Sequence, residues 1–132
     1  MTNSTRHWSY TSANHFSRWV HETIVSGEPC ALYWFIDGAT FKFSLTGQAR
    51  IDFVEQCVTA ALQAGAIPCQ PLNGGDNWEY NPNHGTSPNE IHDSIMNEWI
   101  TNGAGLIAPW TGVWFGLPKQ VYPFSKAHVE ET

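Results

Sequence analysis

The chain has 132 residues, a formal net charge of −6 and only 14% charged residues, against about 25% in typical globular proteins. One domain spanning residues 1–132 can bury a core at this length, and six scattered Lys and Arg residues argue against nucleic-acid binding and favour a basic partner. No apolar run approaches the roughly 18 residues of a membrane span, and the first residues lack an apolar signal core, so we expect a cytoplasmic protein.

The first third of the chain predicts a helix followed by two strands. Residues 1–11 are polar and are expected to form a loose arm. Apolar residues then recur at helical spacing over residues 12–24, before Gly27 and Pro29. The apolar segment 30–36 has the length of a strand, and Asp37-Gly38 is a turn signal before the alternating segment 40–45, so a β-hairpin is predicted.

The middle third predicts a second helix, a short strand and a long loop. A wide apolar stripe runs through residues 46–64, and Gly65 can end that helix. Segment 66–70 is a strand candidate, but Pro68 cannot donate a ladder hydrogen bond and therefore indicates an edge strand or a bulge. Glycine, asparagine and proline then predict an irregular loop over residues 72–85.

The clearest boundary in the chain is Ser87-Pro88-Asn89-Glu90, a capping box with proline at the first helical position. The helix that follows should end at Asn102-Gly103. Segment 111–117 predicts a final strand, and residues 126–132 are expected to be a frayed tail. The fold class expected from this order is α+β: a single domain with a mainly antiparallel sheet and about three helices packed on it.

The reactive side chains show no catalytic or metal-binding spacing. No H-x-x-x-H, H-E-x-x-H or C-x-x-C motif is present, so we expect neither a metal nor a cofactor. Cys30, Cys57 and Cys69 lie in apolar surroundings and are expected to be buried free thiols in a reducing compartment. Cys69, beside the long loop, is the least implausible nucleophile among them.

The long loop is the candidate functional region, because loops of this length in small domains are usually functional or disordered. It carries two large rings and two carboxylates, and such rings dominate protein interfaces. The residues predicted to contact a partner are Asp76, Trp78, Glu79, Tyr80 and His84. For Trp78 the alternative is a ring that folds back and plugs the end of the sheet.

The Trp-rich strands ALYWFI and GVWFGL, the acidic balance and the loop LNGGDNWEYNPNHG together resemble small bacterial immunity proteins. This resemblance implies a protein that binds one cognate toxin, with a basic surface, and plugs or occludes its active site. Phage-encoded inhibitors of host defences share the same profile, and the sequence does not separate the two.

Two further classes remain open. One is a small enzyme or ligand-binding domain with a pocket under residues 72–85, using Asp76, His84 and either His92 or Cys69. The other is a structural subunit of an assembly. Three convergent titratable groups in a pocket favour the enzyme, whereas a flat acidic surface with exposed rings favours partner binding. If the loop is not the interface, the next candidates are the helix surfaces around Glu22, Asp52, Glu55, Asp93 and Glu98.

Overall fold

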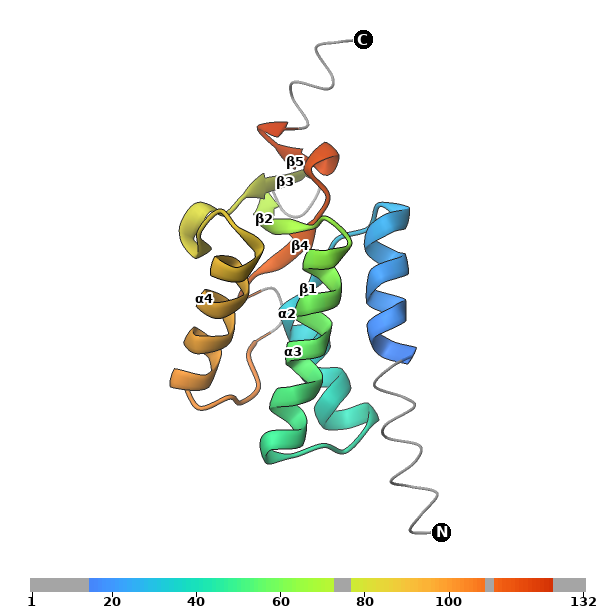
Figure 1. Ribbon diagram of the computed structural model, residues 1–132, viewed down its shortest axis with the longest axis vertical. Helices are drawn as coiled ribbons and strands as arrows, with labels where there is room; N and C mark the ends of the chain where they lie inside the picture. Colours follow the sequence, from blue (N-terminus) through green and yellow to red (C-terminus); the bar gives the residue numbers. More distant parts are fainter. Residues whose placement is uncertain (1–14, 73–76, 109–110, 125–132) are drawn as a thin grey trace.

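The computed structural model describes residues 15–72, 77–108 and 111–124, which form an α+β fold with four helices and one five-stranded sheet (Figure 1). The helices are residues 15–26, α2 (Leu32–Asp37), α3 (Gly47–Gln63) and α4 (Pro88–Thr101). The strands are β1 (Cys30–Ala31), β2 (Ile67–Leu72), β3 (Asn77–Tyr80), β4 (Trp114–Gly116) and β5 (Val121–Tyr122).

The sheet is mixed, which corrects the expectation of a mainly antiparallel one. Its order is β1-β4-β2-β3-β5; the first three pairings are antiparallel and the pairing of β3 with β5 is parallel. The cause lies after β4, where a 3-10 turn at Pro118–Gln120 carries the chain onward without reversing it. Strand β5 therefore continues in the direction of β4 and reaches β3 in parallel.

Successive residues of a strand point to opposite faces of the sheet, and β4 buries both of its faces. Phe115 lies in the larger core with apolar side chains of α3, α4 and the helix of residues 15–26. Trp114 lies in a smaller core on the other face, together with Tyr33, Cys69 and Val121. Both faces of this short strand are covered, so β4 lies between the two cores.

The predicted hairpin over residues 30–45 is wrong. Only Cys30 and Ala31 form a strand, and the chain then turns into α2 and a π-helical turn at Gly38–Lys42. Leu32, Phe35, Ile36 and Ala39 follow helical spacing and are all buried in the larger core. A short apolar run does not distinguish a strand from a buried helix. Here the segment is helical because its apolar side chains are buried on one helical face.

The predicted helix ends are confirmed for α3 and α4. Gly65 and Gly103 follow these helices with φ of 97° and 101°, the left-handed conformation that favours glycine. At the start of α4 the Glu90 amide donates to Ser87 Oγ at 3.1 Å, and the Ser87 amide donates to Glu90 Oε1 at 3.0 Å. Local interactions therefore determine where α3 ends and where α4 begins and ends.

Part of the predicted loop is a strand. Segment 77–80 forms β3 and pairs antiparallel with β2, with Gln70 opposite Glu79 and Pro71 opposite Trp78. Strand β2 lies between β4 and β3, so the edge position expected from Pro68 is also wrong. The Pro68 carbonyl accepts from the Asn81 amide at 3.0 Å, beyond the last residue of β3. The Pro68 nitrogen faces the same side but has no hydrogen to donate back to Asn81, and β3 ends one residue earlier, at Tyr80.

Several sequence expectations fall outside the described residues. They are the arm of residues 1–11, the tail of residues 126–132, and Asp76. Among the helices that the structure describes, none is both long and apolar enough to cross a membrane.

Candidate functional site

The residues predicted as partner contacts do not form one surface. Trp78 and Tyr80 are two apart in β3 and therefore share a face of the sheet, while Glu79 points to the opposite face. There the Glu79 carboxylate accepts a hydrogen bond from Gln70 Nε2 at 2.8 Å. His84 lies after the strand, in the 3-10 turn Pro82–His84. The sequence neighbours are thus separated by the pleat and by a turn.

The two rings of β3 pack within the molecule. The Trp78 ring lies 4.8 Å from that of Trp114, and the Tyr80 ring lies 5.4 Å from that of Phe124. Trp114 in turn contacts Trp34 at 5.2 Å, and Trp34 contacts Trp19 at 6.3 Å. Among the described residues, Trp78 is thus at one end of a row of four tryptophans, and it is half-buried. This packing is what the plug interpretation of Trp78 expects.

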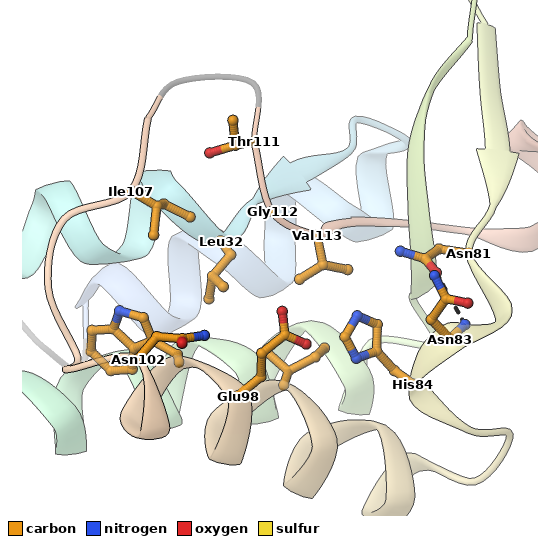
Figure 2. A pocket seen from close by; sticks show the side chains of 12 residues that line it. Leu32, Asn81, Asn83, His84, Glu98, Asn102, Ile107, Thr111, Gly112 and Val113 are labelled. Carbon is orange, nitrogen blue, oxygen red and sulfur yellow. Dashed lines mark hydrogen bonds between the residues drawn. The ribbon is translucent and has the colours of Figure 1, made fainter.

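A cleft of about 390 Å³ opens beside α4 and holds His84 (Figure 2). Its walls come from α2, from residues 81–84, from the C-terminal half of α4, and from residues 107 and 111–113. Buried apolar side chains line it: Leu32, Ile95, Trp99 and Val113. The polar side chains that line it are Asn81, Asn83, His84, Glu98, Asn102 and Thr111.

Short-range contacts hold the polar groups of the cleft in place. His84 Nδ1 and Ser94 Oγ form a hydrogen bond of 2.9 Å, which ties the 3-10 turn to α4. Asn81 Oδ1 accepts from the Asn83 amide at 3.0 Å and caps that turn. Glu98 lies on α4 and Asn102 is the residue directly after it; they are four apart and lie on the same side of the helix. In Figure 2 the Glu98 carboxylate and the His84 ring project toward the segment that carries Thr111 and Val113.

Glu98 and Asn102 were not predicted as cleft residues. Their spacing beside Ile95 and Trp99 is the signal that could have found them, because it places a polar edge along an apolar helical stripe. The opposing wall had no such signal, since α2 was predicted to be a strand.

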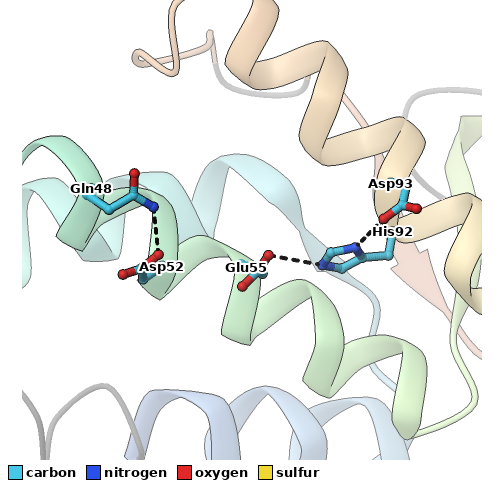
Figure 3. Close-up of polar contacts among 5 residues, drawn as sticks. All are labelled: Gln48, Asp52, Glu55, His92 and Asp93. Carbon is cyan, nitrogen blue, oxygen red and sulfur yellow. Dashed lines mark hydrogen bonds and ion pairs between the residues drawn. The ribbon is translucent and has the colours of Figure 1, made fainter.

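A second feature is an acidic face on α3 and α4, formed by Asp52, Glu55 and Asp93 (Figure 3). All three side chains are exposed. His92 lies between the helices, with Nε2 3.7 Å from Glu55 Oε2 and Nδ1 3.1 Å from Asp93 Oδ1. Gln48 donates to Asp52 at 2.8 Å. Glu55 and Asp93 therefore lie on either side of one imidazole, and Asp52 lies about one helical turn from Glu55 on α3.

The only basic residue of α3 and α4 other than histidine is turned away from solvent. Arg50 is half-buried and donates to the Ala104 carbonyl at 2.9 Å and to Thr40 Oγ1 at 3.4 Å. It thereby fixes the segment after α4 against α3. The hydrogen bonds of its guanidinium therefore go to groups other than the three carboxylates of the acidic face.

The cysteines are buried free thiols, as expected. Burial raises the pKa of Cys30 and Cys69 to about 12 and raises that of Cys57 well above its usual value. A thiol with so high a pKa is almost entirely protonated near neutral pH and is a poor nucleophile. Cys69 also lies in the smaller core beside Trp114, outside the cleft.

Asp76 lies outside the described residues, and the other groups named in the enzyme hypothesis are not brought together. His84 lines the cleft, but His92 is bound between α3 and α4 and Cys69 is in the core. Among the described residues that line the cleft, two have titratable side chains, His84 and Glu98. Within the described ranges, no three His, Cys, Asp or Glu side chains are grouped to hold a metal ion.

Comparison with protein-family models, with curated proteins and with solved structures finds no match to this chain. The cleft and the acidic face are therefore the features of the molecule from which a function can be inferred.

Proposed function

We propose that this protein binds a basic protein partner and inhibits it, and that the partner is a cognate bacterial toxin whose active site becomes occluded. One observation carries the proposal: Asp52, Glu55 and Asp93 are exposed together on α3 and α4, where the single arginine is directed inward. A patch of one sign attracts a partner of opposite sign and suppresses wrong partners.

The acidic face supports this function better than the β3 rings do. An interface ring contributes most when it enters a pocket of the partner, and Trp78 is already packed against Trp114. Contacts by Asp76, Trp78, Glu79, Tyr80 and His84 remain a prediction. A phage-encoded inhibitor of a host defence would use the same surface chemistry against a different target.

The experiment measures association with the product of the neighbouring gene, since immunity proteins are normally encoded beside their toxin. We expect the double substitution Asp52→Asn/Asp93→Asn to slow association about fivefold at low salt and to flatten its salt dependence, because long-range attraction steers the encounter. Stopped-flow binding at several ionic strengths provides both quantities.

The matched control is Glu22→Gln/Glu28→Gln, which removes two exposed carboxylates from outside α3 and α4. It should leave the association rate within about twofold of the unmodified protein. Equal slowing by both double variants would contradict the acidic face as the interface. Co-expression that fails to relieve the partner's toxicity while the complex still forms would contradict inhibition.

The cleft favours a second candidate function, a small ligand-binding or catalytic domain. Its volume of about 390 Å³ lies within the roughly 300–1,000 Å³ of known ligand sites. It also lies beside residues 81–84, within the segment 72–85 under which the sequence predicted a pocket. Of the described residues that line it, two rather than three are titratable, and partner binding is therefore the stronger proposal.

A further inference from the structure

The described residues that line the cleft include one carboxylate and several neutral oxygen acceptors, but no Lys or Arg side chain. Among the residues of the described ranges that line it, Glu98 is the only one with a charged carboxylate. Asn83, Asn102 and Thr111 add amide and hydroxyl oxygens at the edge. In the described part of the chain the Glu98 carboxylate has no hydrogen bond or ion pair, so it is available to a ligand. The charge pattern favours a cation and disfavours an anion.

The apolar lining narrows the class of cation. Leu32, Ile95 and Val113 are buried side chains that line the cleft, so a small hydrated metal ion would leave this surface unused. Basic side chains bury an apolar stem and keep the charged head near water. Arginine suits the edge best, because its planar guanidinium presents five donors to a carboxylate and neighbouring oxygens.

We propose that this cleft receives one arginine side chain of the protein partner, with the stem against the apolar lining and the guanidinium on Glu98. The inference rests on the proposed partner-binding function and names a specific contact for it. The cleft and the acidic face share α4, and a helix with its side chains is only about 10–12 Å across. One partner can therefore contact both.

The test uses the whole protein and a minimal probe, Nα-acetyl-arginine methylamide, followed by amide chemical shifts in NMR. The matched probe is the citrulline analogue, which has nearly the same shape but no charge. We expect saturable shifts for the arginine probe at residues 81–84, 98–102 and 111–113, and markedly weaker shifts for the citrulline probe. Glu98→Gln should weaken binding of the arginine probe at least about fivefold.

Two controls make the result decisive. Glu22→Gln removes one exposed carboxylate outside α4 and should leave probe binding unchanged. An unchanged thermal unfolding midpoint for Glu98→Gln shows that its effect is not loss of fold. Equal binding of both probes, shifts outside the cleft, or equal affinity of Glu98→Gln and the unmodified protein would overturn the inference.

The association and dissociation rates of the complex distinguish the arginine contact from the proposed partner-binding function. If an arginine of the partner occupies the cleft, Glu98→Gln should mainly speed dissociation, whereas Asp52→Asn/Asp93→Asn should mainly slow association. Slower association in the double variant with no effect of Glu98→Gln would overturn the arginine contact and leave partner binding standing. No salt-dependent association at all would overturn the proposed function.

Discussion

The β2–β3 pair and the α4 cleft are neighbours in sequence, yet they use their side chains in opposite ways. Strand β3 carries two large rings and packs them against Trp114 and Phe124. The cleft carries Glu98 and Asn102, whose side chains have no hydrogen-bond partner within the described ranges. A high density of tryptophan is thus a weak guide to an interface. What matters is whether the fold already supplies the ring with a partner.

The largest effect is expected where a ring of β3 is removed, because that ring packs inside the molecule. Trp78→Ala removes a half-buried ring that contacts Trp114 at 4.8 Å, and we expect the free energy of unfolding to fall by about 2 kcal/mol. This is less than the usual cost for a fully buried ring. Urea denaturation measures the change.

Asn77→Ala, an exposed position in the same strand, should stay within about 0.5 kcal/mol of the unmodified protein. An unchanged stability of Trp78→Ala together with weaker partner binding would reverse the comparison. It would make β3 an interface strand rather than a packed one.

A smaller effect is expected at the start of α4, the helix that carries the cleft carboxylate. Ser87→Ala removes the oxygen that accepts from the Glu90 amide at 3.1 Å and should cost about 1 kcal/mol of stability. Asn89→Ala, two residues along in the same turn, is the control and should change stability by less than half as much. Equal losses in the two variants would mean that the cap contributes nothing specific.

The smallest effect is a change in the pH dependence of stability. Hydrogen bonds from the backbone amides and hydroxyls of Ser87 and Thr86 lower the pKa of Glu90 below 4.5. A carboxyl with a lowered folded-state pKa stabilises the protein above its unfolded pKa, and this contribution is lost as pH falls through the folded pKa. Glu90→Gln should therefore be less stable than the unmodified protein at pH 6, and the difference should shrink below about pH 4.5.

Glu22→Gln is the matched control, since it removes the same charge from another helix. A constant difference between Glu90→Gln and the unmodified protein from pH 6 to pH 3 would contradict the capping role of the charged carboxylate. Thermal unfolding across this range provides the measurement.

The sequence predicts those parts of the fold that local chemistry determines. Ser87 and Glu90 lie three residues apart and cap α4 by themselves, and Gly65 ends α3 for a local reason. Segment 30–36 has no such signal. Its helix depends on burial of Leu32 and Phe35 against other parts of the chain, and no local window contains that information.

The candidate site was harder to predict for the same reason. His84 was named because it lies in the loop, but the cleft around it needs α2, α4 and the segment before β4 in one place. The mixed sheet was missed because the pairing of Val121 with Trp78 joins residues far apart in sequence. The cleft and the mixed sheet both depend on contacts between residues far apart in sequence, and such contacts are difficult to predict from a single sequence.

The position of β4 has a consequence for how the chain acquires its structure during synthesis. Strand β1, at Cys30–Ala31, pairs with β4, and β4 also separates β1 from β2. The sheet therefore cannot close until residues 114–116 have left the ribosome, although the helices can form earlier from local contacts. Until then the apolar side chains that pack on Phe115 have no sheet to cover them. The nascent chain consequently depends on its last strands to become resistant to aggregation and proteolysis.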